Sequence, residues 1–160
     1  MGSEVERKFL LSEPPREFAH PSVSIAQRYL VIGADGLEVR LRRRGTATLM
    51  TIKHGVGLVR REEEFEIDAA SFQRLWGMCD GTTIDKQRYR VAADDVIVEV
   101  DVYRGALEGL LTAEVEFASE QEASAYTPAA WLGREVTGDP RYANQQLAMV
   151  GLPPREEQPT

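Results

Sequence analysis

The sequence predicts an α+β protein built on an eight-stranded antiparallel β-sheet that closes into a barrel, with helices packed on the outside. Eight segments alternate apolar and polar residues, which is the period of a half-buried strand. Most connections between them are as short as hairpin loops and carry glycine or aspartate, which favours antiparallel neighbours. Eight strands of this kind are enough to close a barrel.

The predicted strands follow one another with turn residues between them. Gly33 to Gly36, Gly45, Asp94 with Asp95, and Gly105 to Gly109 mark four of these turns. The strands are expected over residues 4–12, 23–32, 36–44, 47–54, 58–67, 82–92, 96–104 and 110–118.

Two or three helices are expected, with candidates at 69–79, 120–131 and 141–150. In the first, Phe72, Leu75 and Trp76 recur at helical spacing. We expect Trp76, Trp131 and Cys79 to be core residues. Residues 1–152 are predicted to form a single domain, and the polar, proline-rich residues 153–160 a disordered tail.

Composition excludes several classes of protein. The chain of 160 residues is 42% apolar and 28% charged, as in ordinary globular domains. Its apolar runs are shorter than the roughly 18 residues of a membrane helix, and its N-terminus is charged where a signal peptide is apolar. A net charge of -7 argues against a nucleic-acid partner. With a single cysteine, we expect a cytoplasmic protein without a membrane partner.

Charged residues occupy one face of seven predicted strands. In the first strand, Glu4, Glu6 and Lys8 share a face because side chains alternate along a strand. A solvated sheet surface is the ordinary explanation. Here, however, the polar faces are almost entirely ionised, and their signs segregate by strand. The acids are Glu4, Glu6, Glu62, Glu64, Glu99, Asp101, Glu114 and Glu116. The bases are Lys8, Arg40, Arg42, Lys53, Arg60, Lys86 and Arg88.

A barrel with this face turned inward would enclose a wet, charged lumen, because buried charges need partners. Carboxylates are suitable ligands for Mg²⁺ or Mn²⁺. Arginine and lysine bind phosphate oxygens. A polyphosphate with a bound metal ion needs both kinds of residue, so the pattern favours such a ligand.

These motifs resemble the CYTH family of triphosphate tunnel metalloenzymes. The segment from Glu4 to Lys8 has the ExExK form that opens this family. Further matching segments follow in order: Gln27–Leu30, Val39–Arg42, Thr51–Lys53, Arg60–Glu64, Lys86–Tyr89, Glu99–Asp101 and Ala113–Glu116. A late segment from Trp131 to Asn144 resembles the short bacterial members, which include inorganic triphosphatases.

The resemblance implies a tunnel that cleaves a triphosphate with the help of Mg²⁺ or Mn²⁺. It implies that Glu4, Glu6, Glu114 and Glu116 hold a metal. A second set, Glu62, Glu64, Glu99 and Asp101, would hold a second metal or orient the attacking water. The implied phosphate ligands are Lys8, Arg40, Arg42, Lys53, Arg60, Lys86 and Arg88. The implied catalytic residues are Glu4, Glu6, Lys8, Glu62 and Glu64.

Several alternatives stay open at this point. The substrate is expected to be inorganic tripolyphosphate, but relatives of this type also make cyclic AMP as class IV-type adenylyl cyclases or hydrolyse thiamine triphosphate. A non-catalytic module that binds polyphosphate or a nucleotide is a further alternative. His54 stands where many members have glycine, and would touch a phosphate if it faced the lumen. The sequence fits a monomer or a homodimer.

Overall fold

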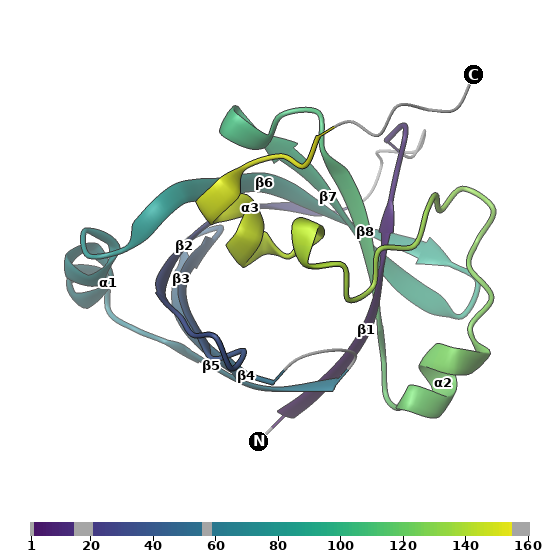
Figure 1. The fold of residues 1–160 in the computed structure, drawn as a ribbon, viewed down its shortest axis with the longest axis horizontal. Coiled ribbons are helices and arrows are strands. Elements are labelled where there is room, and N and C mark those ends of the chain that lie inside the picture. The colour runs from purple at the N-terminus through teal and green to yellow at the C-terminus, as the bar shows by residue number, and fades with distance from the viewer. Residues whose placement is uncertain (1, 15–20, 56–58, 155–160) are drawn as a thin grey trace.

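A computed structural model of the chain describes residues 2–14, 21–55 and 59–154. Its eight strands close into a barrel in the order β1-β5-β4-β3-β2-β6-β7-β8, and every neighbouring pair is antiparallel (Figure 1). The strands are β1 (Gly2–Leu10), β2 (Ser22–Ile32), β3 (Glu38–Arg44), β4 (Ala47–His54), β5 (Val59–Glu66), β6 (Asp80–Ala93), β7 (Val96–Arg104) and β8 (Leu111–Phe117).

The predicted fold class is confirmed. Each strand begins and ends within two residues of its predicted position. The predicted tail lies mostly outside the described residues, which end at Pro154.

The first strand closes the barrel because it pairs with β5 along one edge and with β8 along the other. Glu4 lies opposite Arg60 of β5, while Glu6 and Lys8 lie opposite Glu116 and Glu114 of β8. The strand that carries the ExExK motif therefore joins the two ends of the sheet.

Two helices cover the outside of the barrel. α1 (Ala69–Trp76) begins at Asp68, whose carboxylate accepts a hydrogen bond from the Ser71 amide at 2.8 Å. Its Phe72 packs with Leu41 and Cys79, which confirms the predicted burial of Cys79. α2 (Glu120–Ala125) lies against β1 and β8.

The later helices differ from their predicted bounds. α2 ends at Ala125 instead of residue 131, because Tyr126 is extended ahead of Pro128. The expected core position of Trp131 is wrong, since this side chain is 40% exposed. The third segment is divided by the extended Ala143 into the 3-10 turn η2 (Pro140–Tyr142) and α3 (Asn144–Val150).

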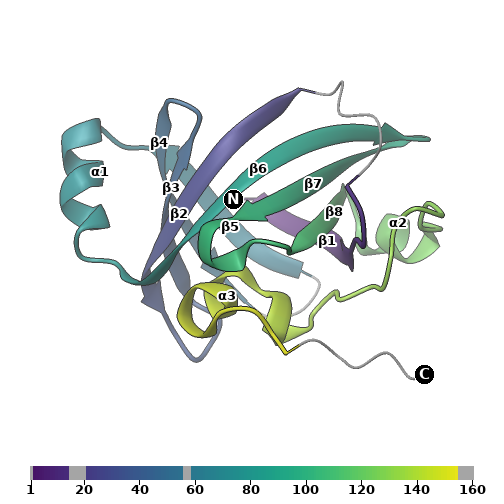
Figure 2. The same ribbon diagram turned by 90° about the horizontal axis from the view of Figure 1, so that it is seen from above.

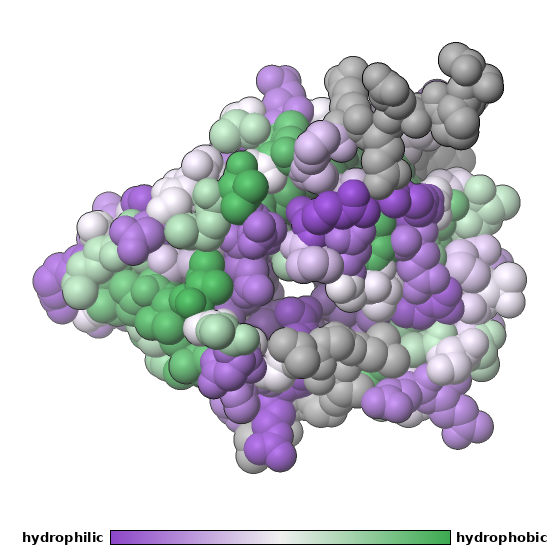
Figure 3. Space-filling model, viewed as in Figure 1, coloured by the Kyte–Doolittle hydropathy of each residue, from purple (hydrophilic) through white to green (hydrophobic). Residues whose placement is uncertain are grey.

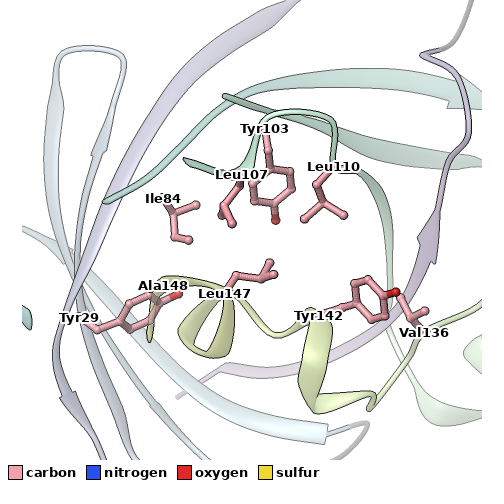
Figure 4. Packing of buried hydrophobic residues seen from close by; sticks show 9 residues of the cluster. All are labelled: Tyr29, Ile84, Tyr103, Leu107, Leu110, Val136, Tyr142, Leu147 and Ala148. Carbon is pink, nitrogen blue, oxygen red and sulfur yellow. The ribbon is translucent and has the colours of Figure 1, made fainter. Parts of the chain in front are cut away.

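α3 packs across one mouth of the barrel, in contrast to α1 and α2 (Figure 2). Its Leu147 and Ala148 join a buried cluster with Tyr29, Ile84 and Tyr103, which come from β2, β6 and β7. Figure 4 shows Leu147 pointing toward Tyr103 and Leu110 across this cluster. Apolar side chains thus fill the barrel near α3. Within the described ranges, the helices are too short and too polar to cross a membrane.

Candidate active site in the barrel lumen

The barrel encloses a cavity of about 790 Å³. Figure 3 shows the molecule hollowed at its centre, with hydrophilic residues around the hollow. Every charged residue predicted for the site lines this cavity, except Lys86 and Asp101. The strand parity read from the sequence therefore brings these side chains together.

Arg40 and Arg42 of β3 form a basic wall that no carboxylate of the described residues contacts at hydrogen-bond length. Both side chains are buried, and the carboxylate oxygens of Glu38, Glu62 and Glu64 lie 3.8–4.0 Å from them, beyond hydrogen-bond length. The Nε of Arg40 is buried without a hydrogen-bond partner within the described part of the chain. Burial, reinforced by Arg40 and Arg88, lowers the pKa of Arg42 to about 10. An anion would relieve this crowding of cations.

On β1 and β8, negative charge is crowded instead, because carboxylates lie close to one another. Burial raises the pKa of Glu6 to about 8, and the neighbouring Glu114 and Glu4 raise it further than Arg60 and Lys53 lower it. Burial also raises the pKa of Glu116, with help from the charge of Glu4. These carboxylates form an acidic wall, which a cation would stabilise.

Two lysines contact carboxylates of the lumen. Lys53 Nζ lies 2.8 Å from a carboxylate oxygen of Glu4 and 2.8 Å from one of Glu62. Lys8 Nζ donates a hydrogen bond to the Tyr142 carbonyl at 2.7 Å and lies 3.7 Å from Glu114. Although burial opposes ionisation, Lys8 and Arg88 hold the pKa of Glu114 well below its ordinary value. Lys8 is thus fixed between the acidic wall and the segment that leads into α3.

Lys86 and Asp101 are the two predicted site residues that lie beneath the cavity wall. Both side chains are 0% exposed, and Lys86 Nζ lies 2.5 Å from Asp101 Oδ2. Burial lowers the pKa of Lys86 to about 7, against the opposing pull of Asp101. Lys86 donates to Asp101, and Asp101 accepts from both Lys86 and Arg88.

Sequence reasoning missed three contributors to the lumen. Glu38 is buried and shares the inward parity of Arg40, so the alternation would have revealed it. Gln27 accepts a hydrogen bond from Arg42 Nε at 3.0 Å, but as a neutral residue it gave no charge signal. The segment around Tyr142 lines the cavity from outside the sheet, where strand parity gives no information. His54 is 58% exposed, with its Nε2 3.8 Å from Asp35 Oδ2.

Whether the carboxylates fit a divalent metal ion depends on their geometry and on their chemistry as ligands. Among the described residues, no three histidine, cysteine or carboxylate side chains converge in metal-binding geometry. The chemistry of the acidic wall nevertheless fits Mg²⁺ or Mn²⁺, because its ligands are hard oxygens whose mutual repulsion raises the pKa of Glu6 and Glu116 beyond the effect of burial.

Fold and lumen together define a barrel protein whose candidate site lies in a charged cavity inside a closed antiparallel sheet. The chain is 43% identical over 148 residues to a Nitrosomonas europaea protein named inorganic triphosphatase, covering 92% of this chain and 97% of the relative. A second inorganic triphosphatase, from Acetivibrio thermocellus, is 34% identical over 149 residues, which are 92% of this chain and 94% of that one.

A solved structure described as the inorganic triphosphatase NE1496 superposes with a TM-score of 0.69 at 40% identity, covering 93% of this chain and 96% of that one. No family model matches the sequence. The similarity to these relatives and the closed barrel show that the chain belongs to the CYTH family of triphosphate tunnel metalloenzymes.

Proposed function

We propose that this protein hydrolyses inorganic tripolyphosphate in the barrel lumen with the help of Mg²⁺ or Mn²⁺. The observation that carries the proposal is the pair of opposed imbalances in one cavity. On one wall Arg42 is crowded by the cations Arg40 and Arg88, while on the other Glu6 and Glu116 are crowded by carboxylates. A metal-bound polyphosphate brings an anion and a cation together, so it satisfies both walls at once. The names of the two bacterial relatives support the same substrate.

Glu4, Glu6, Glu114 and Glu116 are the residues that would hold the metal ion, with Glu99 nearby on β7. When bound, such an ion would neutralise charge on the phosphoryl oxygens, which favours attack on phosphorus and departure of the leaving phosphate group. Because Asp101 is buried against Lys86 and Arg88, we leave it out of this ligand set.

The chain's own residues then have distinct tasks. Arg40, Arg42 and Arg88 bind phosphate oxygens with forked guanidinium groups. Lys8, held by the Tyr142 carbonyl, stabilises negative charge next to the acidic wall. Glu64 is oriented by Thr51, whose hydroxyl donates to Glu64 Oε2 at 2.9 Å. Glu64 Oε1, which lies 3.8 Å from Arg44 Nη1, would accept a proton from the attacking water as its oxygen bonds to the terminal phosphorus and the pyrophosphate group leaves.

The test is phosphate release from tripolyphosphate by the wild type and by Glu4→Gln and Glu6→Gln, with Mg²⁺ and with Mn²⁺. Each substitution keeps the shape of the side chain but removes an anionic metal ligand, so we expect a loss on the order of 100-fold or more. Glu63→Gln, an exposed position on β5, serves as the matched control. Full activity in either lumen variant would disprove the site assignment.

The same assay distinguishes the alternative substrates. Tripolyphosphate, ATP and thiamine triphosphate are compared at equal concentration, with a separate measurement of cyclic AMP. We expect tripolyphosphate to have the highest kcat/KM. Preferential turnover of an organic triphosphate would assign the site to that compound, and binding without turnover under either metal would favour a binding module.

A further inference from the structure

The fully buried ion pair of Lys86 and Asp101 is connected to the lumen through Arg88. Arg88 donates from Nε to Asp101 Oδ1 at 2.7 Å and from Nη2 to Asp101 Oδ2 at 2.8 Å. This is a two-point contact between a planar guanidinium and a planar carboxylate, which fixes orientation as well as distance. Arg88 itself lines the cavity and is 14% exposed, whereas Asp101 lies wholly beneath it.

Lys86 holds Asp101 from the side of α3. Its Nζ reaches Asp101 Oδ2 at 2.5 Å, so that oxygen receives both Lys86 and Arg88. The amine also lies 5.3 Å from the centre of the Tyr103 ring, and the Tyr103 hydroxyl donates to Asn144 Oδ1 at 2.6 Å. An amine donates to a carboxylate in either of its protonation states. The contact with Lys86 therefore fixes the position of the Asp101 carboxylate on the side away from the cavity.

The contacts of Arg88 leave one end of the guanidinium directed away from Asp101. Nη1 contacts Glu99 Oε2, and Nη2 lies 3.7 Å from Glu114 Oε2. Both carboxylates line the cavity. Arg88 is thus held on its buried edge and presents its other edge among lumen residues.

We propose that Asp101 is a positioning residue, supported by Lys86, that fixes the Arg88 guanidinium in the orientation that binds a phosphate group of the substrate. This role replaces the metal contact that the sequence suggested for Asp101 and the phosphate contact suggested for Lys86. It rests on the proposed function for the nature of the substrate. Its physical basis is preorganisation: an arginine already held in place loses less conformational entropy when it binds.

A double-mutant cycle tests this role with Asp101→Asn, Arg88→Gln and the combined variant. The first readout is calorimetric binding of tripolyphosphate in EDTA, which requires neither metal nor turnover. We expect Asp101→Asn to raise Kd about 10-fold, and to change it little further in the Arg88→Gln background, because Asp101 acts through Arg88. Asp85→Asn is the matched control, because Asp85 pairs with Arg104 in an exposed contact on the same two strands.

The second readout is the Mg²⁺ concentration that gives half-maximal phosphate release. For a positioning residue we expect KM for tripolyphosphate to rise while this Mg²⁺ concentration stays unchanged. Independent effects of Asp101→Asn and Arg88→Gln on Kd, or an increased Mg²⁺ requirement in Asp101→Asn, would overturn the proposal. If wild type binds tripolyphosphate without releasing phosphate, the proposed function fails, but the binding cycle still decides the role of Asp101.

Two further variants test the same role if Asp101→Asn does not fold. Lys86→Met with Asp101→Asn removes both buried charges at similar volume, and it is expected to fold and to show the same loss of binding. Lys86→Met alone keeps the two bonds between Arg88 and Asp101, and is expected to lose less. A larger loss in Lys86→Met than in the combined variant would overturn the assignment.

Discussion

The lumen shifts the pKa of Glu6 and of Arg42 in opposite directions for the same reason. Each side chain is buried, and each has neighbours of its own charge. The pKa of Glu6 rises to about 8 and that of Arg42 falls to about 10, so the charged form of each is disfavoured. In their charged forms, Glu6 and Arg42 therefore destabilise the empty fold, and each is well placed to bind an ion of opposite sign.

Glu6→Gln should therefore stabilise the metal-free protein in a pH-dependent way. Glu6 loses its proton near pH 4.5 in the unfolded chain and near pH 8 in the folded one, so stability falls as pH rises through this window. The gain over wild type should be largest at pH 8 and small at pH 5, growing by about 1.4 kcal/mol for each pH unit inside the window. Urea unfolding in EDTA measures it. The same gain at both pH values would contradict the raised pKa of Glu6.

At the scale of elements, the helices on the outside of the barrel contribute stability separately from the lumen. Phe72 of α1 is 1% exposed, and its ring stacks on Trp76 with centroids 5.2 Å apart. The outward face of the strands beneath α1 supplies Leu41 to this cluster, while Arg40 and Arg42 of the same strand point into the lumen. One strand thus serves the core and the site with alternate residues.

Phe72→Ala should cost about 3–5 kcal/mol in the free energy of unfolding, because it leaves a cavity between α1 and the barrel. KM for tripolyphosphate should stay near the wild-type value at a temperature where the variant is folded. Chemical denaturation and steady-state kinetics measure the two effects. Phe72→Leu is the milder control, and a raised KM without loss of stability would contradict the separation of helix and site.

Arg7 connects β1 to the segments that follow β8. Its guanidinium donates to Glu135 at 2.8 and 2.6 Å and to the carbonyls of Ala123 and Tyr126 at 2.9 and 2.8 Å. Arg7→Lys keeps the charge but loses most of these bonds, so we expect a cost of about 1–3 kcal/mol. Urea unfolding against Arg61→Lys, an exposed control on β5, measures it. Equal stability of the two variants would show that the charge alone suffices.

The strands and their inward faces were predictable because a period of two fixes both. How far each inward side chain reaches into the cavity was not predictable. Strand parity places Lys86, Arg88 and Asp101 inside the barrel. It does not show that Arg88 reaches the cavity while Lys86 and Asp101 remain beneath its wall. The position of α3 depends on apolar contacts with Tyr29 and Ile84, which are far away in sequence. These features arise from tertiary packing, which local periodicity does not encode.

At the scale of the whole molecule, the net charge and the charge of the basic wall have opposite signs. The chain carries a net charge of -7, yet Arg40, Arg42 and Arg88 gather inside the barrel. The net charge of the molecule repels a polyanion, whereas the basic wall inside the lumen attracts it. A bound divalent ion lowers the charge of the incoming polyphosphate, so binding should be tighter with Mg²⁺ than without it.

Tripolyphosphate with Mg²⁺ should accordingly stabilise the folded protein against heat. A ligand at 100 times its Kd adds about 2.7 kcal/mol, provided that it binds the folded state alone. Differential scanning fluorimetry measures the shift in Tm for the wild type and for Glu4→Gln, which is expected not to hydrolyse the ligand. Samples are mixed immediately before heating, with tripolyphosphate in large excess so that it stays above its Kd. We expect the wild type to be stabilised more than this variant, and an equal shift in both would place the binding outside the lumen.

The closure of the barrel by β1 also affects when the site forms during synthesis. β1 is made first, but its partner β8 is made last among the strands, and the acidic wall needs Glu6 and Glu116 side by side. A nascent chain that has not yet produced β8 exposes both open edges of its sheet and lacks half of its carboxylates. Contacts so distant in sequence form slowly. The ability to bind a metal ion would therefore report that translation and folding of the barrel are complete.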